Sequence, residues 1–528
     1  MRGPRRLFNK SRRPPERYGS RSKFSQFSGS ACGRSRLHAA RPAAVSIIAV
    51  LSCALLAPAC QRAPARPSIA LIVLDTTRAD AVSAYGGAPG VTPAFDALAQ
   101  GGLLYEHAYS NANWTLPSHA SMFTGLLPSQ NGVRGGTNAL GDMPTMADLL
   151  QRAGYETVGI SENPWLSPRN PMAKRFERFE AADGDTVGHV RDWLRTRKQD
   201  RPFFLFINIM DSHSPYKLRD RNPFLRPGVT KQQAQGVLKN LSRGLDQYLC
   251  TATADGFDMS VLHGLYLGNV QAADAKLGQV LEQLAPLRQA GSLIVIAASD
   301  HGEYFGEQAL MEHEVGVGNA VLRVPLVVGG VRGAAPARIA SPVQLVDLLP
   351  SMLQWSGAPI PDGLAGEVLP TAEPAQPRRR TIVSEYHDYR LSDPSLPPDA
   401  RELELRKWRN CGPEDRISGD MRALLDFPFK LIAYANYPAA LYDVRADPRE
   451  EHDLSATAAE RLGEMQAGLT ALLPTLVVRA SAPKAQLDPA EVERLRALGY
   501  LGGHVAVDEK AAGAHEADNG AASGPPGS

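Results

Sequence analysis

SIALIVLD, residues 68–75, is a continuous apolar run rich in β-branched side chains. Such a run is typical of a strand that is buried on both faces, as in a parallel sheet between two layers of helices. Similar runs recur along the chain at 155–161, 202–211, 292–300 and 324–330. Amphipathic helical patterns separate them, namely TPAFDALAQ, TMADLLQRAG, DTVGHVRDWLRTRKQ, AADAKLGQVLEQL and VQLVDLLPSMLQWSG. The alternation predicts an α/β fold with a mostly parallel sheet flanked by helices.

The composition of the sequence changes after about residue 378. RTIVSEYH, FKLIAYAN and AALYDVRADP are shorter, half-polar runs, which predict a small antiparallel sheet with a closing helix at 456–472. We therefore expect a large domain at 68–375 and a smaller α+β subdomain at 376–502. Residues 217–262 are polar and are predicted to be a loop-like insertion. The tail at 503–528 has too little apolar content to fold and is predicted to be disordered.

The N-terminal part of the chain has the pattern of an export signal. Residues 1–41 hold 12 of the 57 Lys and Arg but one acid, Glu16. An apolar stretch and small residues follow and end in LAPAC, so 1–60 reads as a basic leader and signal segment. LAPAC resembles a bacterial lipoprotein box, in which Cys60 carries the lipid. We expect an exported, membrane-attached protein of the cell envelope, the alternatives being a plain signal peptide cut near Ala59 or an uncleaved anchor.

The rest of the chain is mildly acidic, with 45 basic residues against 54 acidic ones once the 12 and the 1 of the leader are subtracted. That balance argues against a nucleic-acid binder. We expect the partner to be a small-molecule, glycan or lipid ester.

Two of the buried runs end in acidic residues. Asp75 closes the first, and Asp300 and His301 follow the run at 292–300. Ligands of open parallel sheets bind at the carboxyl ends of the strands, so these groups are predicted to meet there. Two carboxylates and an imidazole suit one divalent metal ion, with Ca²⁺ or Mg²⁺ favoured and Mn²⁺ or Zn²⁺ as alternatives. The competing interpretation is that both acids merely cap the turns that follow.

Thr115 lies in NWTLPSHASMFTG, residues 113–125. Pro117 suits the first turn of a helix and Gly125 its end, so Thr115 is placed at or just before a helix N-terminus. There it either caps the helix or presents its hydroxyl as a nucleophile beside a cation. Its place beside the metal candidates favours the nucleophile.

These stretches resemble the sulfatases of the alkaline-phosphatase superfamily. IALIVLDTTRADAVSAYG, TLPSHASMFTG, DSHSPY, SDHGEYFGE and LRVPLVV occur in that family's order, and LYDVRADPREEHDL and LDPAEVERLRALGYLGG resemble its C-terminal region. The resemblance covers about residues 68–502. It implies that Asp75, Asp300 and His301 hold the metal and that His213 and His313 contact the anion or the leaving group. For either histidine, the alternative is a surface or packing role.

The sequence departs from the family at three places. The Cys or Ser that becomes formylglycine in sulfatases is Thr115 here, and the Arg of that motif is His119. Oxidising a threonine gives a ketone, so the aldehyde hydrate that releases sulfate is not available. Thr76 stands where many sulfatases have a second metal-binding Asp, and SENPWL, 161–166, lacks the family's usual Lys and His.

We therefore predict a metal-dependent ester hydrolase of the sulfatase family, with phosphate-type esters favoured because of Thr115. Thr115 would attack, and His313 or His213 would assist the leaving group. The alternatives are a phospho-group transferase of the same fold, sulfate-ester cleavage by direct attack of Thr115, and a non-catalytic surface-lipoprotein binding module.

Overall fold

The computed structural model describes residues 66–135, 138–243, 258–374, 380–388, 413–476 and 493–495. Cys60 and the tail at 503–528 lie outside these residues. No helix in the described ranges is both long and apolar enough to cross a membrane.

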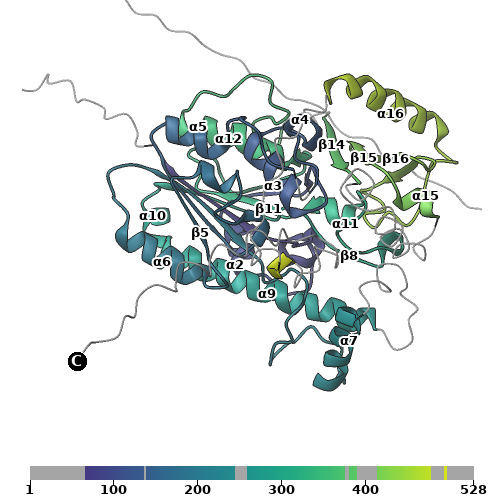
Figure 1. Ribbon diagram of the computed structural model, residues 1–528, viewed down its shortest axis with the longest axis horizontal. Coiled ribbons are helices and arrows are strands. Elements are labelled where there is room, and N and C mark those ends of the chain that lie inside the picture. The colour runs from purple at the N-terminus through teal and green to yellow at the C-terminus, as the bar shows by residue number, and fades with distance from the viewer. Residues whose placement is uncertain are drawn as a thin grey trace, which may run out of the picture. The chain divides into compact units, whose positions relative to one another are not determined.

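An eight-stranded sheet forms the centre of the described structure (Figure 1), in the order β12-β2-β11-β7-β1-β6-β4-β5. Its strands are β1 (Ser68–Leu74), β2 (Leu103–Tyr105), β4 (Glu156–Ser161), β5 (Arg178–Ala181), β6 (Phe203–Ile209), β7 (Leu293–Ala298), β11 (Leu326–Gly329) and β12 (Ala337–Ile339). The pairs β1–β6, β1–β7, β4–β6, β4–β5 and β12–β2 are parallel, whereas β11 is antiparallel to both neighbours. The predicted α/β class is confirmed, with β11 as the reversed strand.

Helices cover both faces of this sheet (Figure 1). The α-helices of the large domain are α2 (Pro93–Gln100), α3 (Thr115–Thr124), α4 (Pro128–Asn131), α5 (Met146–Arg152), α6 (Thr186–Thr196), α7 (Lys231–Arg243), α9 (Met259–Gln283), α10 (Ala285–Gln289), α11 (Asn319–Leu322) and α12 (Leu348–Ser356). Short 3-10 turns lie at 79–81, 83–85, 164–166, 173–175, 307–309, 345–347 and 473–475.

Strand β1 shows how the two faces are divided. Ile69, Leu71 and Val73 belong to one apolar cluster with side chains of α3, α5 and α12. The intervening residues Ala70, Ile72 and Leu74 belong to another, with side chains of α2, α6 and α9. Because successive side chains of a strand point to opposite faces, a run that is apolar at every position is what a sheet between two helical layers requires.

A second, antiparallel sheet follows in the C-terminal part, in the order β14-β15-β16-β17. Its strands are β14 (Thr381–Tyr386), β15 (Met421–Asp426), β16 (Phe429–Tyr434) and β17 (Ala440–Asp443), and the helices near it are α15 (Glu414–Ile417) and α16 (Ala459–Leu472). This confirms a smaller C-terminal subdomain that contains a sheet. The short strands β3 (Ala108–Tyr109), β10 (Arg323–Val324) and β13 (Val343–Gln344) form a three-stranded sheet, and β8 (Tyr304–Phe305) pairs with β9 (Met311–Glu312).

The prediction that 217–262 is loop-like is wrong for part of that segment. It contains α7 and the start of α9, which begins at Met259. Ala234 and Val237 of α7 are buried with Val261 and Leu265 of α9. These few apolar residues, spaced on one helical face within polar sequence, are enough to dock α7.

Candidate active site

The predicted metal ligands meet at the carboxyl edge of the central sheet. Asp75 directly follows β1, and Asp300 and His301 follow the neighbouring strand β7. All three are buried, and one potential ligand atom from each lies within 4.8 Å of the others. The two strands bring together residues that are more than 200 positions apart.

Thr76 fixes the two acids relative to each other. Its backbone lies in the left-handed region, with φ 59°, a conformation that is costly for a β-branched residue. In this conformation its N–H donates to Asp300 Oδ1 at 3.1 Å and its hydroxyl donates to Asp75 Oδ1 at 2.8 Å. Many sulfatases have a second metal-binding Asp at this position. Here Thr76 instead holds Asp75 and Asp300 through hydrogen bonds.

The electrostatics of the two carboxylates fit a divalent cation. Burial and the charge of Asp75 raise the pKa of Asp300 to about 8. Burial also acts to raise the pKa of Asp75, but His213 and His301 outweigh it, and Asn208 contributes, so that this pKa is lowered to about 2. Within the described residues, Asp300 Oδ2 is buried with no hydrogen-bond partner. A buried carboxylate oxygen without a hydrogen-bond partner, next to a second carboxylate, is what a cation would stabilise.

Thr115 is the first residue of α3, and the N-cap of this helix is Trp114. The hydroxyl oxygen of Thr115 lies 3.3 Å from Asn163 Nδ2, which can donate to it, and 3.4 Å from His301 Nε2. Thr115 is fully buried. The structure therefore brings the candidate nucleophile to the metal candidates, one position past the cap of its helix.

His119 stands one helical turn after Thr115. Its Nδ1–H donates to the carbonyl oxygen of Thr115 at 2.9 Å, and Nδ1 lies 3.5 Å from Asp300 Oδ2. The ring is buried and packs edge-on against Phe123 and Phe206. His119 thus links the first turn of α3 to Asp300.

His213 and His313 reach the same edge from two loops. The His313 ring lies 4.4 Å from the ring of His301 and 5.0 Å from that of His213, measured between centroids. Burial, with His301 and His213 nearby, lowers the pKa of His313 well below its ordinary value. All the side chains named in the sequence as site candidates are thus gathered at this edge.

Around Asp75, the sequence analysis missed Asn163, Asn208 and Ser212. Asn163 Nδ2 donates to Asp75 Oδ2 at 2.8 Å, and Asn208 Nδ2 donates to the same oxygen at 3.0 Å. Ser212 donates to the carbonyl oxygen of Asp75 at 2.6 Å. Asn163 and Ser212 follow strands β4 and β6, so the strand-end rule that found Asp75 also applied to them. Asn208 lies inside β6 and gave no such signal.

Comparison with known proteins agrees with this arrangement. The family model described as Sulfatase matches residues 67–358, which is more than half of the chain. The chain belongs to the sulfatase family. Enzymes of this family use a divalent metal ion, and the buried Asp and His cluster is the candidate site for one.

Several known proteins are similar to this sulfatase-family chain at low sequence identity. The uncharacterized sulfatase YidJ of Escherichia coli K12 is 24% identical over 438 residues, which cover 74% of this chain and 83% of that protein. Human N-sulphoglucosamine sulphohydrolase is 26% identical over 382 residues, covering 65% and 73%. The phosphonate monoester hydrolase of Agrobacterium radiobacter has the same fold, with a TM-score of 0.59 and 22% identity over 78% of this chain and 96% of that one. This sulfatase-family chain is an ester hydrolase.

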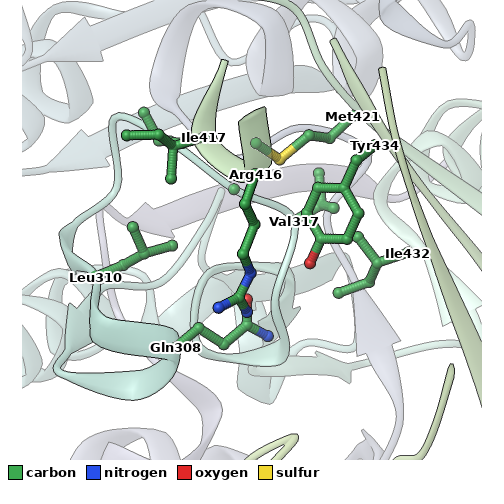
Figure 2. Close-up of a pocket in the computed structure, with 10 residues that line it drawn as sticks. Gln308, Leu310, Val317, Arg416, Ile417, Met421, Ile432 and Tyr434 are labelled. Carbon is green, nitrogen blue, oxygen red and sulfur yellow. The ribbon is translucent and has the colours of Figure 1, made fainter. Parts of the chain in front are cut away.

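A cavity in the described residues lies elsewhere, between the C-terminal sheet and the segment around His313 (Figure 2). Its lining combines apolar side chains with Gln308, Arg416 and Tyr434. It includes none of the metal candidates, nor Thr115, so the chemistry is assigned to the sheet edge and not to this cavity.

Proposed function

We propose that this enzyme hydrolyses phosphate-type esters, phosphodiesters or phosphonate monoesters, with Thr115 as the covalent nucleophile. The observation that carries the proposal is the place of the Thr115 hydroxyl, between Asn163 and His301 and beside the two buried acids. A hydroxyl that served only the helix would not need these neighbours.

In the first step, Thr115 Oγ1 gives its proton to His313 or His213 and bonds to phosphorus, and the bond from phosphorus to the leaving oxygen breaks with its electron pair. The same histidine then passes this proton to the leaving oxygen. In the second step, water gives a proton to the histidine and bonds to phosphorus, the bond between Thr115 Oγ1 and phosphorus breaks with its electron pair, and Thr115 Oγ1 takes that proton from the histidine. A cation bound by Asp75, Asp300 and His301 would stabilise negative charge on the oxygens. Asn163 would donate a hydrogen bond near the same oxygens.

We propose Ca²⁺ or Mg²⁺ as the cation, with Mn²⁺ and Zn²⁺ as alternatives. Two of the three candidate ligands are carboxylates, and oxygen-rich sites favour the harder ions. Backbone and water oxygens complete such sites in proteins. Metal analysis of the purified enzyme, followed by restoration of activity with each ion after chelation, tests the choice.

Phosphate-type esters are favoured over sulfate esters by the chemistry of threonine. The secondary alcohol cannot give the aldehyde hydrate that eliminates sulfate. Asn163 follows β4, in the stretch where the family's usual Lys and His are lacking, so the transferring group meets a neutral amide there. The phosphonate monoester hydrolase with the same fold is a structural precedent for such substrates on this fold.

Substitution of Thr115 tests the proposal. Thr115→Ser keeps a hydroxyl and should retain substantial activity on aryl phosphodiesters and phosphonates. Thr115→Val keeps the shape without the hydroxyl, and its kcat/KM should fall roughly a thousandfold or more, as when a covalent nucleophile is lost. The matched control is Thr124→Val at the far end of the same helix, where the hydroxyl donates to the Ala120 carbonyl, and it should leave kcat/KM nearly unchanged. Parent activity in the Thr115→Val enzyme would refute the nucleophile.

A substrate panel separates this proposal from its rivals. Turnover of aryl sulfates above that of every phosphate-type ester would favour direct attack of Thr115 on sulfur. Transfer of the phospho-group to an added alcohol in preference to water would favour a transferase. A panel of aryl sulfate, phosphate monoester, phosphodiester and phosphonate esters therefore decides among them.

We also propose that the enzyme is exported and attached to a membrane through lipid on Cys60. The support is the LAPAC motif after an apolar stretch. The native protein should partition with membranes, and Cys60→Ser should release it or block its processing. A mature N-terminus at another residue, found by mass spectrometry, would contradict the proposal.

A further inference from the structure

Glu303 holds the ring of His313. This glutamate lies two residues after His301, in the SDHGE stretch, and is fully buried. Its Oε1 lies 3.0 Å from His313 Nδ1. A carboxylate is an acceptor, so this contact favours a proton on Nδ1 of the imidazole.

The carboxylate of Glu303 is itself fixed. The hydroxyl of Tyr216, which lies in the loop after β6, donates to Glu303 Oε2 at 3.1 Å. Arg78 Nη1 donates to the backbone carbonyl of Glu303 at 2.7 Å. Two segments that are far apart in the sequence thus hold one buried glutamate, and its Oε1 contacts His313.

The backbone of His313 is hydrogen-bonded to a residue close to Thr115 in the sequence. Asn113 Nδ2 donates to the carbonyl oxygen of His313 at 2.7 Å, and Asn113 stands two residues before Thr115. The ring lies against those of His301 and His213. With the proton of Nδ1 directed at Glu303, Nε2 is the ring nitrogen that can accept a proton from the reacting groups and pass it to the leaving oxygen.

We infer that Glu303, supported by Tyr216, is a positioning residue that orients His313 for its contact with the leaving group. The inference rests on the proposed function, in which His313 assists the leaving oxygen. Glu303 touches no reacting atom in this scheme. It fixes the orientation of the ring and the nitrogen that carries the proton, as carboxylates do for catalytic histidines in general.

The test is the dependence of kcat/KM on the leaving group, measured with aryl methylphosphonates that range from 4-nitrophenyl to phenyl. A poor leaving group needs assistance and a good one needs little. For Glu303→Gln we therefore expect a loss of roughly 10- to 100-fold with the phenyl ester and a much smaller loss with the nitrophenyl ester. Tyr216→Phe should make kcat/KM depend more steeply on the leaving group in the same direction, but by a smaller amount. This variant replaces Glu303→Gln in the test if Glu303→Gln fails to fold. An unchanged leaving-group dependence in a folded Glu303→Gln enzyme, or in Tyr216→Phe if that variant stands in, would overturn the inference.

A double substitution shows whether Glu303 acts through His313. In a His313→Ala background, Glu303→Gln should cause no further loss, because the ring it orients is gone. Independent, multiplying losses would contradict the inference. Asp274→Asn is the control for changing a buried carboxylate to an amide, since Asp274 accepts from the N–H groups of Ala94 and Phe95 at the start of α2. It should leave the leaving-group dependence as in the parent.

Failure of the proposed function gives a different result. If Thr115→Val keeps the activity of the parent, or the parent turns over none of the esters, the nucleophile assignment falls and the inference falls with it. If Thr115→Val is inactive but the leaving-group dependence is the same in the parent and the folded Glu303 variant, only the inference fails.

Discussion

Asp300 combines three features that are unfavourable in the protein without a cation. It is fully buried, it lies close to Asp75, and its Oδ2 has no hydrogen-bond partner among the described residues. Burial and Asp75 together raise its pKa to about 8. A residue with these properties destabilises the metal-free fold and is retained where a ligand compensates for it.

Asp300→Asn should therefore stabilise the metal-free protein more as the pH rises. A carboxyl whose pKa is higher in the folded state binds more protons there, so its contribution to the free energy of unfolding falls from about pH 4 to about pH 8. The Asn side chain of the variant does not titrate, so the variant does not lose this stability as the pH rises. Urea unfolding with a chelator present, at about pH 5 and about pH 8, should show the advantage of the variant growing with pH.

Added cation should make the parent more stable than the Asp300→Asn variant. It should stabilise the parent by binding only the folded state, and elemental analysis should find little or no metal in the variant. A variant that keeps full metal occupancy, or an advantage that does not change with pH, would contradict the role given to Asp300.

At this scale, the sequence predicted the residues that end buried strands. Asp75, Asp300 and His301 were found because the change from apolar to ionisable side chains at the end of a strand can be read directly from the sequence. Asn208 could not be found in this way, since it is one polar residue inside β6 and its relation to Asp75 depends on the pairing of β6 with β1. The bond of Glu303 to His313 depends on the fold of the segment between them, which no local pattern encodes.

At the scale of the elements, a lysine of α9 forms ion pairs with the segments that follow β4 and β6, and both of these segments carry site residues. Lys276 Nζ lies 2.6 Å from Glu162 Oε1 and 2.5 Å from Asp211 Oδ2. Glu162 directly precedes Asn163, and Asp211 lies two residues before His213. The lysine thus connects the segments that follow β4 and β6.

Lys276→Met should lower both stability and kcat/KM. It leaves two largely buried carboxylates without their shared cation, which should cost about 1–3 kcal/mol, less than for a fully buried pair because Lys276 is partly exposed. Denaturant unfolding and kcat/KM on a phosphodiester measure the two effects. Lys231→Met is the control, since Lys231 and Asp220 form an exposed pair, and it should change neither. Equal behaviour of the two variants would contradict the bridging role of Lys276.

The order of the elements was largely predictable, and their pairing was less so. The strands at 68–75, 155–161, 202–211 and 292–300 were predicted because each is a run rich in apolar and β-branched residues. The reversed direction of β11 was not, because strand direction in a sheet depends on the path of the connections. Strand β15 was missed, as its run MRALLD mixes polar and apolar residues and gains its strand character from pairing with β14 and β16.

In the whole molecule, a buried ion pair joins the C-terminal sheet to the segment that carries His313. Lys430 of β16 and Glu450 lie 2.6 Å apart, and each side chain is 1% exposed. Glu450 Oε2 also accepts from Asn319 N at 2.9 Å and from Gln308 Nε2 at 3.0 Å. The small sheet is therefore connected to the residues on either side of His313.

Lys430→Met should destabilise the protein by about 3–5 kcal/mol, because it leaves the Glu450 charge buried and unpaired. Adding Glu450→Gln should recover much of this loss, since the amide can keep a hydrogen bond without a charge. Denaturant unfolding of the two single variants and the double variant gives the coupling free energy. A double variant whose loss is the sum of the two single losses would show that the pair is not coupled.

The central claim is that Thr115 forms a covalent bond to the substrate, and mass spectrometry of the quenched enzyme tests it most directly. The parent enzyme is mixed with an excess of an aryl methylphosphonate, quenched in acid during turnover and digested. The account predicts a methylphosphonyl group on Thr115 of the parent, on the introduced serine of the Thr115→Ser enzyme, and on no residue of the Thr115→Val enzyme. A methylphosphonyl group on another residue, or an unmodified Thr115 in an enzyme that shows a burst of released phenol, would contradict it.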